Sequence, residues 1–358
     1  MKDIVRLGAA FIGLMVGGGF ASGQEVVQFF DAFGLYGLVG TAVSGAFFML
    51  LVMELYTIGS QLRITTHQQA MTQLFGARAS WAADILLSFF LLCMITVMIA
   101  GSGASIHQQF GPPAWVGSAI MAVLACLTMG LDVRRIVNLI GIMTPLVFLM
   151  VLIMLGYSLH QPIAPVAALE QAAQQQPHAA GHWLVAAVLY VSYNIAGAAA
   201  VLLVLGGQVP DLRLARLGGL AGGGAFGLLL AGLAFVLFVQ VDAIRGAAVP
   251  TLLLAGRISP VFGAVLLPVI LVKLYCSSVG MTYALSSRLE EYGLSRLKGA
   301  ALVTGCAWGM SQLGFVMLVK AVYPMIGYCG LLIMAATLFS FLRRRRTAPA
   351  PRPDVNQT

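Results

Sequence analysis

Long apolar runs occupy most of this 358-residue sequence, and few charged residues interrupt them. Hydrophobic residues make up 60% of the chain and charged residues only 9%, whereas a soluble domain has about 25% charged residues. A soluble protein of this length has too much surface to keep so many apolar side chains out of water. The composition therefore excludes a soluble enzyme and a nucleic-acid-binding protein, despite a formal net charge of +8. It predicts an all-α polytopic membrane protein.

The number of apolar stretches predicts the number of membrane spans. A helix needs about 20 mostly apolar residues to cross a bilayer. The sequence predicts ten transmembrane helices, at 4–33, 35–62, 81–110, 113–130, 133–159, 181–208, 217–240, 261–289, 297–319 and 321–342. Only Gly34 separates the first two.

Basic residues indicate how these spans are oriented, because Lys and Arg concentrate in cytoplasmic loops. With the N-terminus in the cytoplasm, sixteen of the twenty Lys and Arg residues lie on the cytoplasmic side. We therefore predict a multi-pass protein of the cell (inner) membrane with both termini in the cytoplasm. The basic, Pro-rich tail at 343–358 is predicted to be disordered.

The longest polar stretch divides the spans into two groups of five. Residues 1–160 form a first five-helix repeat, 161–180 an extracellular connector, and 181–342 a second five-helix repeat. A five-helix unit that starts inside ends outside, so its second copy must have the opposite orientation. This is the arrangement of transporters with inverted repeats. The segment 241–260 is predicted to be an external lid.

Glycines in the middle of the first span predict that this helix is broken. Three consecutive glycines occupy 17–19, and each costs about 1 kcal/mol relative to alanine in a helix. Close helix packing is the alternative explanation, but packing motifs space their glycines four apart on one face. Unwinding here would present N–H groups to an anion and carbonyls to a cation. The predicted substrate-binding residues are Gly18, Gly19, Phe20, Ala21, Ser22 and Gly23.

The sixth span is the corresponding helix of the second repeat, and polar and small residues interrupt it at mid-depth. We predict a second unwound segment there, since paired interruptions mark the binding site of such transporters; a tight packing turn is the alternative. Its predicted substrate-binding residues are Tyr193, Asn194, Ile195, Ala196 and Gly197. Tyr193 and Phe20 are candidate aromatic gates.

The motif of the first span resembles a known family. The string GGGFASGQE at 17–25, followed by Gln28-Phe29-Phe30, resembles the first helix of the YkvI-like membrane proteins. These are grouped with the amino acid permeases of the amino acid–polyamine–organocation superfamily. That family is similar to the LeuT-fold transporters, and the resemblance implies a 5+5 inverted repeat in which helices one and six are broken. It also implies that the substrate's carboxylate and amine meet the two breaks.

The same resemblance implies a sodium site. In sodium-coupled members, carbonyls of the broken first helix and two hydroxyls of helix eight bind the ion. Gly13, Val16, Gly17 and Gly19 match the pattern of the first helix. The predicted ion-binding residues are Gly13, Val16, Ser277 and Ser278. The asparagine that holds a second sodium in those symporters is not evident in this sequence, so the resemblance does not extend to that second site.

Glu25, Glu54 and Lys273 are predicted to lie inside the membrane, where ionisable residues are costly and commonly functional. Three interpretations of Lys273 remain open. It pairs with a carboxylate such as Glu25, it occupies or borders the cation site and couples transport to protons, or it extends to the membrane surface or the substrate. Glu25 is predicted to cap the outer half-helix or to bind an ion, and Glu54 to make a structural hydrogen bond.

These features predict a secondary active transporter and not an enzyme. The expected substrate is a small zwitterion or amine, most simply an amino acid, carried by alternating access and driven by a sodium or proton gradient. Its expected partners are this small molecule and the lipid bilayer, with no cofactor except sodium as a coupling ion, no bound metal and no nucleic acid. The alternatives are a transporter of the same fold for another solute, such as a metal ion, and a channel-like protein. The sequence contains no G-x-x-x-x-G-K-[ST] motif for ATP.

Overall fold

The structure is a computed structural model that describes residues 2–66, 69–70, 80–130, 133–291 and 293–347. Every regular element in these ranges is a helix. In chain order these elements are α1 (Lys2–Met15), α2 (Gly18–Ser22), α3 (Gln24–Phe29), η1 (Asp31–Phe33), α4 (Leu35–Leu62), α6 (Ser80–Phe110), α7 (Ala114–Leu127), η2 (Thr128–Gly130), α8 (Val133–His160), α9 (Val166–Ala173), α10 (Trp183–Gly207), α11 (Leu212–Val239), α12 (Pro250–Ile258), α13 (Pro260–Glu291), α14 (Arg296–Ser311) and α15 (Phe315–Thr347).

Seven of the described helices are long and apolar enough to cross a membrane, which makes the chain a multi-pass membrane protein. They are α4, α10, α11 and α13, together with most of α6, α8 and α15. The first, fourth and ninth predicted spans correspond to shorter helices, namely α1–α3, α7 and α14. The count of ten spans therefore stays a prediction.

Two predicted boundaries near the C-terminus were wrong. Span nine ends at Ser311 and not at 319, because the chain turns at Gly314, whose φ of +91° is readily accessible only to glycine. The helix α15 then continues to Thr347, so residues 343–347 are helical and not disordered. Arginine is a good helix former, and a run of arginines extends the helix. The rest of the predicted disordered tail, 348–358, lies outside the described residues.

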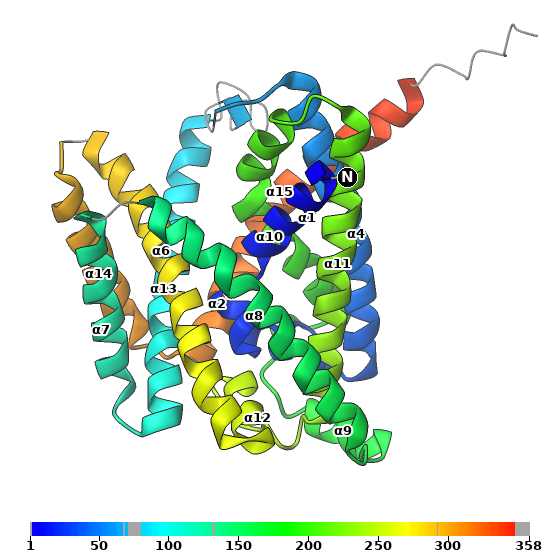
Figure 1. Cartoon of the computed structure of the whole chain (residues 1–358), viewed down its shortest axis with the longest axis vertical. Helices are drawn as coiled ribbons and strands as arrows, with labels where there is room; N and C mark the ends of the chain where they lie inside the picture. Colours follow the sequence, from blue (N-terminus) through cyan, green and yellow to red (C-terminus); the bar gives the residue numbers. More distant parts are fainter. Residues whose placement is uncertain (1, 67–68, 71–79, 131–132, 292, 348–358) are drawn as a thin grey trace, which may run out of the picture.

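Close contacts between glycines and neighbouring backbones hold α4, α11 and α1 together (Figure 1). A Cβ atom at Gly223 of α11 would lie 2.6 Å from the Cα atom of Met49 in α4. At Gly227 it would lie 2.8 Å from the Cα atom of Gly45. Small residues at such positions let membrane helices approach closely. On the other flank of the molecule, α7 and α14 pack beside α6 and α13 (Figure 1).

The two ends of the bundle carry different elements. The N-terminus and the last turns of α15 lie at one end, and the short helices α9 and α12 lie at the opposite end (Figure 1). The helix α9 lies in the predicted connector, where its Glu170 accepts a hydrogen bond of 2.8 Å from the backbone N–H of Leu35 at the start of α4. Gly34 provides the sharp turn at this point, with a φ of +63°. The connector thus fixes the boundary between the first two spans.

Candidate functional site

The first span is interrupted between Met15 and Gly18, in the middle of the bundle (Figure 1). The backbone N–H of Gly17 donates to the carbonyl of Met15 at 2.8 Å and leaves the carbonyl of Gly13 out of the helical pattern. A second interruption follows at Gly23, whose φ is +75°. The glycine run therefore divides the span into the three short helices α1, α2 and α3.

Side chains of α8 and α13 face the interruption. The Nζ atom of Lys273 donates to Oγ1 of Thr144 at 2.8 Å. A Cβ atom on Gly13 would lie 3.7 Å from that threonine oxygen, and one on Gly17 would lie 3.8 Å from Oγ of Ser277. Lys273 and Ser277 are one turn apart on α13, so the same face of this helix follows the break.

Of the four residues predicted to hold sodium, three lie near the interruption. Gly13 lies in the last turn of α1, Val16 follows the end of this helix, and Ser277 lies opposite Gly17. Ser278 is fully buried, and its hydroxyl has no hydrogen-bond partner among the described residues. The sodium site itself stays a prediction.

The two sides of the interruption differ in exposure. Gly13, Gly17 and Ser277 are half-buried, whereas every residue from Gly18 to Gly23 is buried. On the side of α12, Oγ1 of Thr251 donates to the carbonyl of Ala21 at 2.6 Å. Residues 18–23 are therefore enclosed beside α12, whereas the end of α1 and the facing part of α13 are partly exposed.

The start of α12 is held by a second contact. The side-chain amide of Gln108, near the end of α6, donates to the carbonyl of Val249 at 2.9 Å and accepts from its N–H at 3.0 Å. These two hydrogen bonds and the one from Thr251 join α12 to α6 and to span one. The external lid at 241–260 stays a prediction.

Glu25 on α3 lies in a cluster of tyrosines. Its carboxylate accepts hydrogen bonds from the hydroxyls of Tyr190 at 3.2 Å and Tyr193 at 2.9 Å, both on α10. A Cβ atom on Gly19 would lie 2.6 Å from Oε2 of Glu25 and 2.7 Å from the hydroxyl of Tyr323 on α15. The absence of a side chain at Gly19 thus leaves room for the carboxylate and this hydroxyl.

The predicted ion pair between Lys273 and Glu25 was wrong. Lys273 bonds to a threonine hydroxyl, and Glu25 bonds to two tyrosine hydroxyls. In the described part of the chain, no Lys, Arg or His nitrogen lies within ion-pair distance of Glu25. The two residues lie on opposite sides of the glycine run, Lys273 beside α1 and Glu25 at the start of α3. Capping or ion binding by Glu25 stays a prediction.

The predicted break in span six was also wrong. The helix α10 is continuous from Trp183 to Gly207. The side-chain amide of Asn194 donates to the carbonyl of Tyr190 one turn earlier, at 2.8 Å. The asparagine is therefore satisfied by its own helix, and no unwinding is needed to provide it with a partner. Gly197 is exposed and has no other atoms within 4 Å of its Cβ position.

Few of the predicted substrate-binding residues of α10 reach span one. Tyr193 does so through Glu25, whereas Ile195 is buried and Ala196 lies against Gly330 of α15. Phe20 packs against Phe226 of α11, with ring centroids 5.5 Å apart, and not against Tyr193.

No pattern in the sequence indicates four residues that the structure adds to the site: Thr144, Tyr190, Thr251 and Tyr323. Each is a single polar residue within an otherwise apolar stretch or a loop, and none belongs to the motif that the first span carries.

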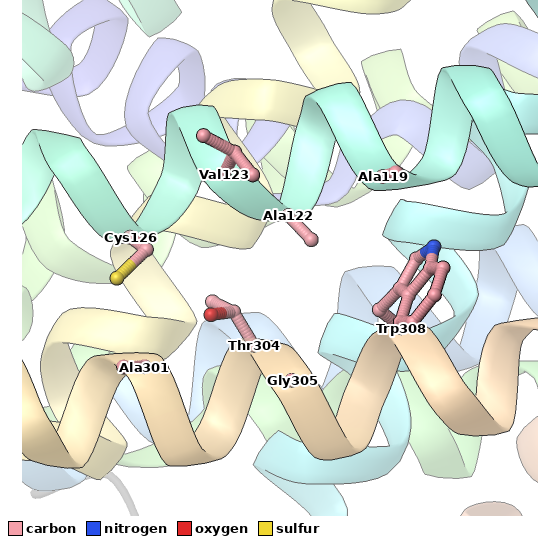
Figure 2. A pocket seen from close by; sticks show the side chains of 8 residues that line it. All are labelled: Ala119, Ala122, Val123, Cys126, Ala301, Thr304, Gly305 and Trp308. Carbon is pink, nitrogen blue, oxygen red and sulfur yellow. The ribbon is translucent and has the colours of Figure 1, made fainter.

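A groove of about 400 Å³ between α7 and α14 lies apart from these residues. Figure 2 shows that Ala122 and Cys126 of α7 face Thr304 and Trp308 of α14 across it. Its lining contains no charged side chain, so it does not resemble a site for a charged or zwitterionic solute.

Relatives of the chain are found by sequence, although no protein-family model matches it. The uncharacterized membrane protein YkvI of Bacillus subtilis (strain 168) is 28% identical over 346 residues, which cover 96% of this chain and 97% of that protein. The uncharacterized protein YyaD of the same organism is 23% identical over 330 residues, covering 91% and 94%. The resemblance that the first span indicates is thus confirmed over nearly the whole chain.

Solved structures share the fold at low identity. The inward-facing conformation of Mhp1, a nucleobase-cation-symport-1 family transporter, has a TM-score of 0.68 at 13% identity and covers 95% of this chain and 77% of that one. MhsT in complex with L-phenylalanine has a TM-score of 0.58 at 14% identity, covering 92% and 88%. A mutant of the Eremococcus coleocola manganese transporter has a TM-score of 0.57 at 15% identity, covering 94% and 77%.

Mhp1 and the manganese transporter are transporters by their descriptions, and at 13–15% identity the likeness shows a shared fold. The chain is therefore a relative of YkvI and has the LeuT-like fold of membrane transporters.

Proposed function

We propose that this protein is a secondary active transporter that carries a small zwitterionic or amine solute, most simply an amino acid, by alternating access. One observation carries the proposal: span one is interrupted at mid-bundle, where residues 18–23 are buried and Gly13 and Gly17 are half-buried. A central site that is reachable from one side at a time is what alternating access requires. Ten transmembrane helices in a 5+5 inverted repeat, with both termini in the cytoplasm of the cell membrane, complete the proposal.

The surroundings of Lys273 support proton coupling. Its ammonium is 2% exposed and bonds to Thr144, which in turn lies beside Gly13 at the end of α1. A positive charge therefore lies near the end of α1, where sodium was predicted to bind. A second cation there would be repelled by the ammonium. Loss and gain of a proton on Lys273 would supply the coupling charge.

Sodium coupling is the second candidate. It is favoured by the position of Ser277 opposite Gly17 and by the turn at Gly17, which releases the carbonyl of Gly13 from the helix. In this case Lys273 would be a structural link between α13 and α8.

Transport of a metal ion, as in the manganese transporter of the same fold, has less support. In the described ranges no group of three or more His, Cys, Asp or Glu side chains is placed to hold a metal ion. The interruption is lined by glycines, a threonine and a serine, whereas Mn²⁺ prefers carboxylate and other oxygen ligands in greater number. A channel would need a polar or charged ring around a pore.

Uptake by proteoliposomes tests the proposal. We expect the purified protein to accumulate an amino acid or amine when a proton gradient is imposed, and Lys273→Met to abolish this accumulation while solute exchange across the membrane continues. A sodium gradient that drives uptake equally well in both proteins would instead favour the sodium site. Absence of both binding and gradient-driven flux for all amino acids and simple amines would refute the transporter function.

A further inference from the structure

The groove between α7 and α14 offers a ligand only apolar surface. Among its lining residues, only Thr304 and Trp308 carry a nitrogen or oxygen atom in the side chain. The hydroxyl of Thr304 donates to the carbonyl of Ala300 in its own helix at 2.8 Å. The indole N–H of Trp308 donates to the carbonyl of Trp115 at 3.4 Å. With both groups already hydrogen-bonded, the groove suits a hydrocarbon ligand.

The groove is open on the outer surface of the bundle. Val123 of α7 and Ala301 and Gly305 of α14, which all line it, are exposed. A Cβ atom on Gly305 would have no other atom within 4 Å, and Figure 2 shows Ala122 and Thr304 facing each other across the groove. Small residues thus keep α7 and α14 from filling the space between them. In a membrane protein such a surface faces the acyl chains of lipids.

One end of the groove is closed and the other leads to a lysine. The contact between Trp308 and Trp115 joins the two helices at the closed end. In the opposite direction along α14, Gly305, Ala301 and Lys298 are spaced four and three residues apart, which places them on the same side of the helix. Lys298 is exposed. Side chains on a helix point toward its N-terminus, so the ammonium lies beyond the apolar part of the groove.

The positive charge of Lys298 is not used within the described part of the chain. No carboxylate there lies within ion-pair distance of its ammonium. Arg296, two residues earlier, is instead paired with Glu290 at 2.9 Å and lies over the ring of Tyr283, 5.0 Å from its centroid. Of the two basic residues at the start of α14, Lys298 is therefore the one that can bind an external anion.

The length of the groove matches one leaflet of a bilayer. Ten residues separate Lys298 from Trp308, which corresponds to about 15 Å along a helix and to half of a hydrocarbon core about 30 Å thick. An acyl chain that starts at a headgroup beside Lys298 has this reach. A helix of a second copy would cross the whole core and would meet the contact between Trp308 and Trp115.

We propose that this groove binds an acyl chain of an anionic phospholipid whose phosphate pairs with Lys298. The proposal does not depend on the transport function. Basic residues between helices at the membrane surface recognise anionic headgroups, and each methylene group that the groove covers adds to the affinity. Phosphatidylglycerol should bind more tightly than phosphatidylethanolamine, because the ammonium of the latter headgroup is repelled by Lys298.

Lipid binding by the full-length protein in a neutral detergent tests the proposal. The lipid that stays bound after purification from membranes that contain both phospholipids is identified by mass spectrometry. We expect the wild type to retain phosphatidylglycerol in preference to phosphatidylethanolamine, and added phosphatidylglycerol to raise its melting temperature. Inorganic phosphate alone should not raise it, because the acyl chain supplies most of the binding.

Two substitutions on α14 test the groove itself. Gly305→Leu places a side chain in the groove and should weaken phosphatidylglycerol binding at least about tenfold. Gly309→Leu is the matched control, since a Cβ atom there also has no other atom within 4 Å but the residue does not line the groove. It should leave lipid binding unchanged.

Two substitutions of lysine test the headgroup contact. Lys298→Gln should lower the preference for phosphatidylglycerol over phosphatidylethanolamine about fivefold. Lys320→Gln removes an exposed lysine near the start of α15 and should leave this preference unchanged. Because Lys298 is exposed, its substitution decides the question even if Gly305→Leu fails to fold.

Three outcomes would overturn the proposal. The first is equal phosphatidylglycerol binding by the Gly305→Leu and Gly309→Leu variants. The second is equal lipid preference in the Lys298→Gln and Lys320→Gln variants. The third is a wild-type dimer that Gly305→Leu converts to a monomer, which would assign the groove to a second copy of the chain.

Discussion

A methyl group added at Gly223 should force α4 and α11 apart. The Cβ atom of an alanine there would lie 2.6 Å from both the Cα and the N atom of Met49. Ordinary van der Waals contact begins at 3.4 Å, so the two backbones must separate by about 0.8 Å along a seam that also includes Gly219 and Gly227. The contact atoms belong to a helix backbone, which cannot rotate away as a side chain does.

The adjacent residue provides the control. A Cβ atom on Gly224 would meet only the Met49 side chain, at 3.6 Å, which is ordinary contact. Both substitutions replace glycine by alanine in the same helix, so the propensity gain of about 1 kcal/mol is common to them. The difference between them isolates the overpacking cost, which is about 1–3 kcal/mol.

Thermal unfolding of the two variants in detergent measures this difference. For a protein of this size we expect Gly223→Ala to melt about 2–6 °C below Gly224→Ala, at about 2 °C per kcal/mol. Gly224→Ala should melt at or above the wild-type temperature. Equal melting temperatures for the two variants would refute the close approach of α4 and α11 at this point.

Four further predictions concern the site and its lid. Glu170→Gln should lower stability by about 0.5–1 kcal/mol in the same thermal assay, because a charged acceptor at the start of α4 is lost. Gly19→Ala should displace the Glu25 carboxylate and the Tyr323 hydroxyl and lower stability by about 1 kcal/mol in the same thermal assay, because the added methyl group overpacks this cluster. Thr251→Val removes the hydrogen bond to Ala21, worth about 1 kcal/mol, and should raise about fivefold the rate at which a thiol reagent added on the α12 side modifies a cysteine placed at Ala21. Lys273→Ala should retain amine binding while losing uptake driven by a proton gradient, and loss of both would contradict a coupling role.

The sequence predicts the helices well because hydropathy is a local property. A segment that crosses the bilayer must be apolar and a loop in water must be polar. This pattern can be recognised in the sequence without knowing how the helices pack. Gly34 separates α4 from the first span where expected, since a positive φ at this position requires glycine. Boundaries between closely spaced spans are less certain, as at Gly314, because a short polar turn hardly changes the hydropathy.

Broken helices are harder to predict, and the two candidates show why. Of the run at 17–19 only Gly17 lies outside a helix, since Gly18 and Gly19 begin α2, so the interruption is shorter than the run. In α10, one asparagine and one glycine are compatible both with a continuous helix and with an unwound segment. The side chain of Asn194 bonds to the carbonyl of its own helix, and nothing in the local sequence distinguishes this from an unwound turn.

Partners of charged residues cannot be read from sequence at all in this chain. The tyrosines that hold Glu25 lie 165 and 168 positions away, and Thr144 lies 129 positions from Lys273. Pairing Lys273 with Glu25 was the simplest electrostatic guess. In the structure the Lys273 ammonium instead donates to the hydroxyl of Thr144, and the Glu25 carboxylate accepts hydrogen bonds from two tyrosines.

The glycine run at 17–19 has two structural effects, one at the end of α1 and one beside Glu25. At its start it ends α1 beside Lys273 and Ser277, where the structure is half-exposed. At Gly19 it admits the carboxylate of Glu25 beside α2, where the structure is closed by Thr251. The helix α2 packs against α13, whereas α1 packs chiefly against α11, so the turn at Gly17 joins two halves of span one that have different neighbours. We expect a charge change at Lys273 to act at this turn, which would give the mechanical link that coupled transport requires.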